Sequence, residues 1–264
     1  MEARLDQLQL VLKTIAKQGN PQSPYWFMGL EESTDPNYTA DQQILTQYQT
    51  ASEQAAGKII PLSYARVRKA YQPTWGGYIK LLLSVRDAVE GPQSEWTTND
   101  VLHYQRNVLG DSDIQEYSTC LLELSPLPRK TRGHPWVYGD IADRPGMEFL
   151  SSYESFSAYQ LVKDRASLII DEVENYKPRV LFVFGKDGEF ALRDKVEDLV
   201  SYEVVKSDSG RSMPAYIGTL DSTLVVFSYH PAYRPITTYW RRLGAIAAGK
   251  LPPSNDTLVK AAEG

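Results

Sequence analysis

The feature that most constrains the fold of this 264-residue chain is a continuous apolar run, Val180–Phe184. Lys177-Pro178 precedes the run and Gly185 follows it. A strand that is buried on both faces reads as an unbroken apolar run, and proline and glycine are common breakers at the ends of such a segment. The run therefore predicts a central strand of a largely parallel sheet.

Three further short apolar runs predict strands at residues 25–28, 118–124 and 224–227. The segments around them have the composition and spacing of helices, and we place helices at 3–17, 79–89, 153–176, 188–200 and 237–248. Residues 202–205 and 215–217 are expected to form an antiparallel pair. Strands that are separated by helices indicate one α/β domain with a mostly parallel sheet.

We treat residues 1–264 as a single domain with its core at about 25–248 and a tail at 252–264. The hydrophobic content of 42% is that of a globular protein. A net charge of −5 argues against a binder that tracks phosphates by charge alone. It does not exclude an enzyme with basic residues gathered on one face.

One cysteine, Cys120, leaves no partner for an internal disulfide and excludes a four-cysteine zinc or iron–sulfur site. We expect Cys120 to be a small buried core residue, and we expect no metal or cofactor. No signal-peptide pattern or membrane-length apolar run is visible. A cytoplasmic protein without a membrane partner is therefore expected, and we take it to be a monomer.

The ends of the four predicted strands carry the most distinctive residues. They read Gly29-Leu30-Glu31, Glu123 before Ser125-Pro126, Gly185, and His230-Pro231. In a parallel sheet the functional loops follow the carboxyl ends of the strands, so these residues are well placed for chemistry. His230 could instead simply cap its strand. Gly185-Lys186 fits a helix cap better than a phosphate loop, because the upstream glycine of that loop is missing.

The order of these four strand ends resembles the uracil-DNA glycosylase superfamily. In that family a first strand ends in a glycine loop with an Asp, Asn or Glu, and a second ends near an Asn and a proline-bearing loop. A third strand follows Lys-Pro and ends in glycine, as Lys177–Gly185 does here. A fourth ends in His-Pro-Ser, which Val225–Pro231 resembles. The resemblance covers roughly residues 25–248.

The resemblance implies a three-layer α/β/α sandwich around a mostly parallel four-stranded sheet. It also implies a hydrolase that cleaves the N-glycosidic bond of uracil, or of another modified or deaminated base, in DNA. Glu31 would assist water or stabilise the oxocarbenium-like sugar, with Glu32 as the alternate. His230 would donate a hydrogen bond to the departing base. Either glutamate could instead cap the next helix.

Further residues receive roles by the same resemblance. The base flips out of the stack to reach such a site, and its expected contacts are Gly29, Leu30, Glu123, Tyr38 and Trp136. Trp26 and Phe27 are also aromatic candidates there, although core packing suits them better. The expected DNA contacts are Arg129, Lys130, Arg132, Tyr233 and Arg234. The basic loop at 129–132 could also be simply solvated.

The chain departs from the family pattern at three places. Ala232 stands where the family has serine, so it has no hydroxyl for a backbone phosphate. The first loop lacks the proline after the acid. Glu123 stands where an Asn would read the base edge, and an ionised glutamate accepts hydrogen bonds but cannot donate them. It therefore suits an amino group better than a carbonyl.

Three functions remain open at this point. The first is an N-glycosylase that acts on a base in DNA. The second is a non-catalytic nucleic-acid-binding protein of the same fold, which the missing serine and Glu123 favour. The third is a hydrolase of free nucleosides or nucleotides, which the acidic net charge favours.

Overall fold

The computed structural model describes residues 2–29, 37–62, 73–91, 96–108, 119–129, 135–204, 213–229 and 237–249. Within them the helices are α1 (Leu5–Lys13), α2 (Ala40–Ala55), α4 (Pro73–Glu90), α5 (Thr98–Asn107), α6 (Tyr153–Ala158), α7 (Gln160–Lys163), α8 (Arg165–Tyr176), α9 (Lys186–Leu192) and α10 (Thr237–Ala247). Short 3₁₀ helices are η1 (Val137–Ile141), η2 (Glu148–Leu150) and η3 (Arg193–Lys195). The strands are β1 (Gln18–Gly19), β2 (Tyr25–Gly29), β3 (Thr119–Glu123), β4 (Val180–Phe184), β5 (Glu197–Val204), β6 (Met213–Leu220) and β7 (Thr223–Ser228).

The fold class is α/β, as predicted, but the sheet is larger and mixed. Among the described residues seven strands form one sheet in the order β1-β3-β2-β4-β7-β6-β5. β2, β4 and β7 are neighbours that run parallel, whereas β7, β6 and β5 are antiparallel. The predicted antiparallel pair of residues 202–205 and 215–217 is confirmed in its described part, where Tyr202 faces Ala215.

The prediction of a four-stranded, mostly parallel sheet is therefore wrong. The apolar-run criterion finds only strands that are buried on both faces, and an antiparallel strand can leave one face in water. β5 carries Glu197, Asp198 and Ser201 on exposed positions, so it does not read as an apolar run. β1 has two residues and offers no periodicity to recognise.

The described chain divides into two compact units. One comprises Met1–Gln18, Gly29–Ile60 and Leu121–Tyr176, and the other Gly19–Met28, Pro61–Cys120 and Lys177–Gly264. The prediction of a single domain remains a prediction. Each unit is described by itself below.

In the second unit, β4 has a helix on each face. Phe27 of β2 stacks on Phe182 of β4 with ring centroids 5.3 Å apart, and Tyr78 of α4 stacks on Phe27 at 4.7 Å. Met28 and Val183 form the next pair in the register and therefore point to the opposite face. There Gly188 of α9 lies so close that a Cβ would be 2.7 Å from Val183 Cγ1.

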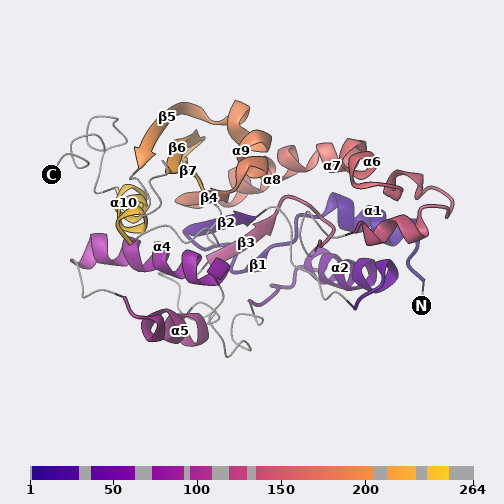
Figure 1. Ribbon diagram of the computed structural model, residues 1–264, viewed down its shortest axis with the longest axis horizontal. Coiled ribbons are helices and arrows are strands. Elements are labelled where there is room, and N and C mark those ends of the chain that lie inside the picture. Colours follow the sequence, from indigo (N-terminus) through magenta and orange to yellow (C-terminus); the bar gives the residue numbers. More distant parts are fainter. Residues whose placement is uncertain are drawn as a thin grey trace. The chain divides into compact units, whose positions relative to one another are not determined.

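The same unit contains a close pair of helices, α4 and α10, which lie next to each other in Figure 1. Gly244 of α10 allows the contact, because a Cβ at this position would be 2.3 Å from Ser84 Cβ on α4. The predicted core residues Trp26, Phe27 and Cys120 are buried in this unit. Trp26 and Phe27 are thus core residues, which is the role that the sequence favoured for them.

In the first unit, α1 packs on α2 over a core that includes Leu8, Ile44, Tyr138 and Phe156. Arg144 joins this packing, because its guanidinium donates to both carboxylate oxygens of Asp41 at 2.6 and 2.8 Å. This contact holds the pKa of Asp41 below its usual range.

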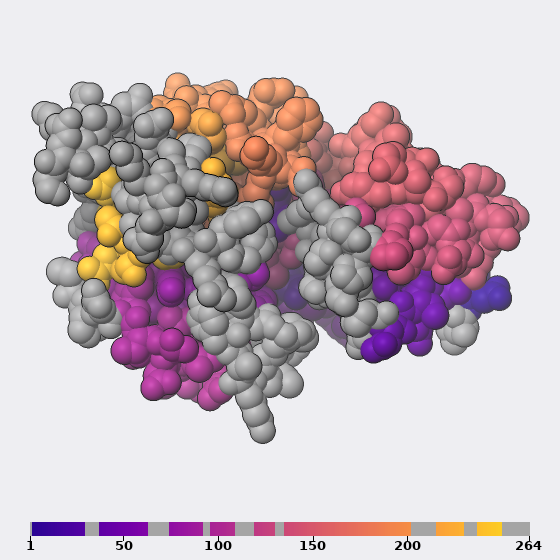
Figure 2. All heavy atoms as spheres, viewed as in Figure 1, coloured from indigo at the N-terminus to yellow at the C-terminus, as the bar shows by residue number. Residues whose placement is uncertain are grey.

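The rose-coloured part of the surface in Figure 2 belongs to the region of α6 and α7.

Three predicted helices are shorter than expected. The one predicted at 3–17 spans only Leu5–Lys13. The helix predicted at 153–176 is three helices, α6, α7 and α8. The break between α6 and α7 lies at Tyr159, which has extended backbone at φ −65° and ψ 135°. The ring of Tyr159 stacks on Phe149 with centroids 3.9 Å apart, which favours this break. The helix predicted at 188–200 ends at Leu192, and β5 begins at Glu197.

Candidate functional site

Two predicted site residues, Gly29 and Glu123, are in direct contact at the ends of their strands. Gly29 is the last residue of β2 and Glu123 the last of β3. The Leu124 amide donates to the Gly29 carbonyl at 3.0 Å. The Glu123 carboxylate lies directly over Gly29, so that a Cβ there would be 2.5 Å from Oε2. Gly29 is therefore required for the close approach of this carboxylate.

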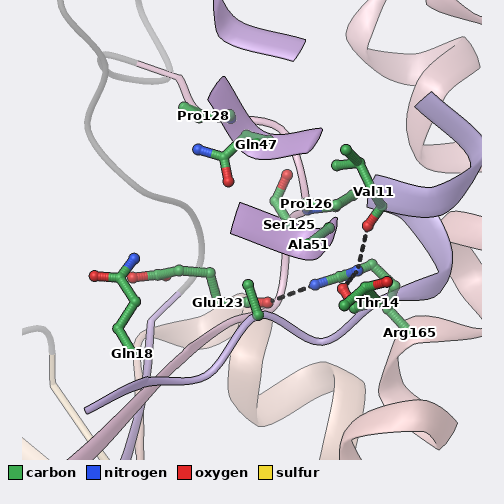
Figure 3. A pocket seen from close by; sticks show the side chains of 11 residues that line it. Val11, Thr14, Gln18, Gln47, Ala51, Glu123, Ser125, Pro126, Pro128 and Arg165 are labelled. Carbon is green, nitrogen blue, oxygen red and sulfur yellow. Dashed lines mark hydrogen bonds between the residues drawn. The ribbon is translucent and has the colours of Figure 1, made fainter. Parts of the chain in front are cut away.

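Glu123 also lines a small pocket in the first unit (Figure 3). Polar groups come from Thr14, Gln18, Gln47, Ser125 and Arg165, and the remaining wall from Val11, Ala16, Ala51, Pro126 and Pro128. The cavity volume is about 20 Å³. One water molecule needs roughly 10–15 Å³ on this measure, so the pocket has room for water but not for a nucleobase.

Arg165 closes one side of this pocket and connects three segments of chain. Its Nη1 donates to the carbonyls of Leu12 and Thr14, each at 3.1 Å, at the C-terminal end of α1. Its Nε donates to the Leu124 carbonyl at 2.7 Å, and Nη2 to the Glu123 carbonyl at 3.1 Å. Helices leave their last carbonyls without partners inside the helix. Arg165 thus caps α1 and ties it to the end of β3.

The charge of Arg165 is buried next to Glu123. Burial lowers the pKa of Arg165 to about 10, and the Glu123 carboxylate opposes this shift. The guanidinium therefore stays charged at neutral pH. Its hydrogen bonds named above go to main-chain carbonyls, and Figure 3 shows the Glu123 side chain extending away from Arg165 toward Gln18. The two groups attract each other through their charges.

Three other predicted contacts lie in the first unit. Tyr38 is 43% exposed just before α2. Trp136 is half-buried, donates from Nε1 to the Leu150 carbonyl at 2.6 Å, and packs on Tyr138. The guanidinium of Arg129 lies 4.6 Å from the ring centroid of Tyr153. Their roles in binding a base or DNA stay predictions.

In the second unit, β4 and β7 end side by side. Gly185, with φ +86°, donates from its amide to the Ser228 carbonyl at 3.0 Å. It is the N-cap residue of α9, as the cap interpretation predicted. The end of β7 is held from α10, because the Tyr239 hydroxyl lies 2.7 Å from Ser228 Oγ and accepts from the Tyr229 amide at 3.4 Å.

Several predicted site residues lie outside the described residues. These are Leu30, Glu31, Lys130, Arg132, His230, Tyr233 and Arg234, together with the alternate Glu32 and with Ala232. Both proposed catalytic residues belong to this group, so their roles remain predictions.

Sequence reasoning missed Arg165 and Tyr239. Arg165 stands at the start of a helix between Asp164 and Ala166, where an arginine normally reads as a surface residue. Tyr239 falls on the apolar face of α10, where it reads as a core residue. Neither position carries a sequence signal for its polar contacts.

No protein-family model, curated protein or solved structure matches this chain. The part of the chain that the structure describes contains no group of three or more His, Cys, Asp or Glu side chains that could hold a metal ion. The helices among these residues include none that is long and apolar enough to span a membrane.

Proposed function

We propose that this protein is an N-glycosylase that releases a modified or deaminated base, uracil among the candidates, from DNA. Glu31 assists the attacking water and His230 stabilises the departing base. The proposed architecture is the three-layer sandwich, which is supported by α4 and α9 on opposite faces of β4.

The proposal rests on one observation, which is the register of the three parallel strands β2, β4 and β7. Met28, Val183 and Phe227 form one row across β2, β4 and β7. Glu31 follows Met28 by three residues, and His230 follows Phe227 by three residues. Because neighbouring strands are about 4.8 Å apart, the ends of β2 and β7 are separated by roughly 10 Å. This supports a substrate bound between a carboxylate and an imidazole.

The two side chains supply what the bond cleavage needs. The bond between C1′ of the sugar and the base nitrogen breaks, and its electron pair leaves with the base. Water adds to C1′ and gives its proton to Glu31, which also stabilises positive charge on the sugar. His230 donates a hydrogen bond to the base as negative charge develops on it. Glu31 then releases this proton to solvent and the base anion takes one up, so the products are the free base and an abasic site.

The experiment uses labelled oligonucleotides that carry uracil, hypoxanthine, xanthine or no modified base. After incubation with the protein, alkali cleaves the strand wherever a base has been released. We expect Glu31→Gln and His230→Ala to lower the rate by about 100-fold or more each. Glu174→Gln and His103→Ala, at exposed positions on α8 and α5, are the matched controls and should cleave at the wild-type rate. Full activity in both catalytic variants would contradict the proposal.

The second candidate, a non-catalytic nucleic-acid-binding protein, is favoured by the small pocket beside Glu123. Its volume of about 20 Å³ does not admit a base. This candidate predicts salt-dependent binding of the same oligonucleotides without alkali-sensitive sites.

A further inference from the structure

We infer that Arg241 and Arg242 on α10 bind successive phosphates of a DNA strand, with Trp96 holding Arg241 in position. We call Arg241 and Arg242 the arginine pair. The inference rests on the proposed function for the identity of the polymer, and it adds a binding surface to that function. No bond of the DNA is broken at this surface.

The positive charge of the arginine pair has no partner among the described carboxylates. α10 contains two arginines and no Asp or Glu. Its apolar face, which includes Leu243 and Ile246, is buried, whereas both arginines are partly exposed. Within the described part of the chain neither guanidinium makes an ion pair or a hydrogen bond. In a chain with a net charge of −5, this local excess of positive charge favours an anionic partner.

The carboxylate of Asp87, on the neighbouring helix α4, is already engaged. Its Oδ1 accepts from Arg86 Nη2 at 3.3 Å, and its Oδ2 accepts from Trp96 Nε1 at 3.0 Å. The charge of Asp87 is therefore matched by Arg86, and the arginine pair stays without a counter-charge.

Trp96 fixes the guanidinium of Arg241. The Cζ atom of Arg241 lies 5.4 Å from the centroid of the Trp96 ring, which is a cation–π contact. The ring is itself held by the bond from its Nε1 to Asp87. Arg241 Nε is buried and has no hydrogen-bond partner, so stacking rather than an acceptor holds the group. The Nη donors then serve a phosphate, which arginine binds with two parallel N–H groups.

The placement of the arginine pair on its helix favours a polymer over a single small anion. Because a helical turn has 3.6 residues, consecutive side chains point about 100° apart, and such neighbours do not face each other. The two arginines therefore suit two separate phosphates. A DNA strand offers a phosphate at every nucleotide, and arginine is a common donor to this backbone.

The experiment measures binding of labelled single-stranded and duplex oligonucleotides by fluorescence anisotropy at a series of salt concentrations. The test variant combines Arg241→Gln with Arg242→Gln. The matched control combines Arg193→Gln with Lys195→Gln, which removes the same number of charges from exposed positions. Arg193 already has a carboxylate partner, because its Nη1 lies 2.6 Å from Glu189 Oε1.

We expect the test variant to bind roughly 10-fold or more weakly than the wild type, and its slope of log K against log salt to be smaller by about 2. The control should keep the affinity and the slope of the wild type. Arg241→Lys with Arg242→Lys keeps both charges and should keep the slope, while its affinity falls because lysine lacks the planar guanidinium. Thermal unfolding verifies that each variant folds.

Inorganic phosphate distinguishes a free ion from a strand. We expect it to leave the melting temperature of the wild type no higher than sulfate-free, phosphate-free buffer of equal ionic strength does. Stabilisation by phosphate that is lost in the test variant, without any binding of oligonucleotides, would overturn the inference in favour of a small-anion site.

Alkali treatment of the same reactions, with oligonucleotides that carry uracil, hypoxanthine or xanthine, reports separately on the proposed function. Weaker binding by the test variant, without release of a base by the wild type, would sustain the inference and refute the proposed function. Equal affinity and equal salt slopes in the test variant and the wild type would overturn the inference, and base release by both would leave the function intact. A wild-type protein that binds no oligonucleotide would overturn both.

Discussion

At the scale of single residues, Arg165 binds several main-chain carbonyls of the candidate site. Its guanidinium donates to the carbonyls of Leu12, Thr14, Glu123 and Leu124. These carbonyls belong to segments more than 100 positions apart in the sequence. The side chain is thus an internal cap whose loss affects both α1 and the end of β3.

We predict that Arg165→Met lowers the free energy of unfolding by about 3 kcal/mol or more, because buried carbonyls lose their donors at about 1–3 kcal/mol each. Urea denaturation at neutral pH measures the change. Arg4→Met removes an arginine whose ion pair with Asp6 is exposed, and it should leave the unfolding midpoint unchanged. Equal midpoints for the two variants would show that the Arg165 contacts contribute little.

Tyr239 is a second buried residue that sequence reasoning missed. Burial raises the pKa of its phenol to about 12, whereas an unfolded tyrosine titrates near 10. Between these values the unfolded chain binds fewer protons than the folded one. The contribution of Tyr239 to stability is therefore complete below about pH 10 and is lost as the pH rises toward about 12.

We predict that Tyr239→Phe loses about 1 kcal/mol of stability at neutral pH, because the hydrogen bond to Ser228 is gone. The stability curves of wild type and variant should approach each other from pH 10 upward. Chemical denaturation at a series of pH values tests this, with the exposed Tyr38→Phe as control. A constant difference across the alkaline range would rule out the linkage.

At the scale of elements, Gly244 sets the distance between α4 and α10. A Cβ at this position would be 2.3 Å from Ser84 Cβ and 2.7 Å from the Val85 amide nitrogen. Backbone atoms cannot move aside as the end of a flexible side chain can. The two helices must therefore separate if a Cβ is added at Gly244.

We therefore predict that Gly244→Ala destabilises the protein by about 1–3 kcal/mol, although alanine is the better helix former. Thermal unfolding provides the measurement. Thr238→Ala, at an exposed position of α10, should change stability by less than about 0.5 kcal/mol. An unchanged or higher melting temperature for Gly244→Ala would show that the interface can relax.

The elements that the sequence predicts correctly are those whose residues are all buried. Val180–Phe184 is buried on every residue, so its composition reports its environment directly. β5 is different, because its polar residues face water and resemble those of a helix or loop. The break at Tyr159 depends on stacking against Phe149, a contact that no local pattern encodes.

The candidate site likewise contains residues that the sequence predicts and contacts that it does not. Gly29 and Glu123 follow apolar runs, so the sequence places them correctly at strand ends. Their contact depends on which strands become neighbours, and β2 and β3 are distant in the chain. Arg165 was missed because its partners are main-chain carbonyls, which every residue has.

At the scale of the whole molecule, we propose that the protein makes abasic sites in DNA through Glu31 and His230. The parallel register of β2, β4 and β7 is the structural support for this proposal. The identity of the base is a separate matter. The most direct test should therefore not depend on choosing the right base.

That measurement uses duplex DNA treated in separate portions with an alkylating or a deaminating reagent, so that many modified bases are present at once. The protein is added, and abasic sites are counted with a reagent that labels their aldehyde group. We predict that sites accumulate with the wild-type protein and with Glu174→Gln, but not with Glu31→Gln or His230→Ala. If the wild-type protein is folded and binds the DNA but no abasic sites form in any portion, the proposed glycosylase activity is wrong.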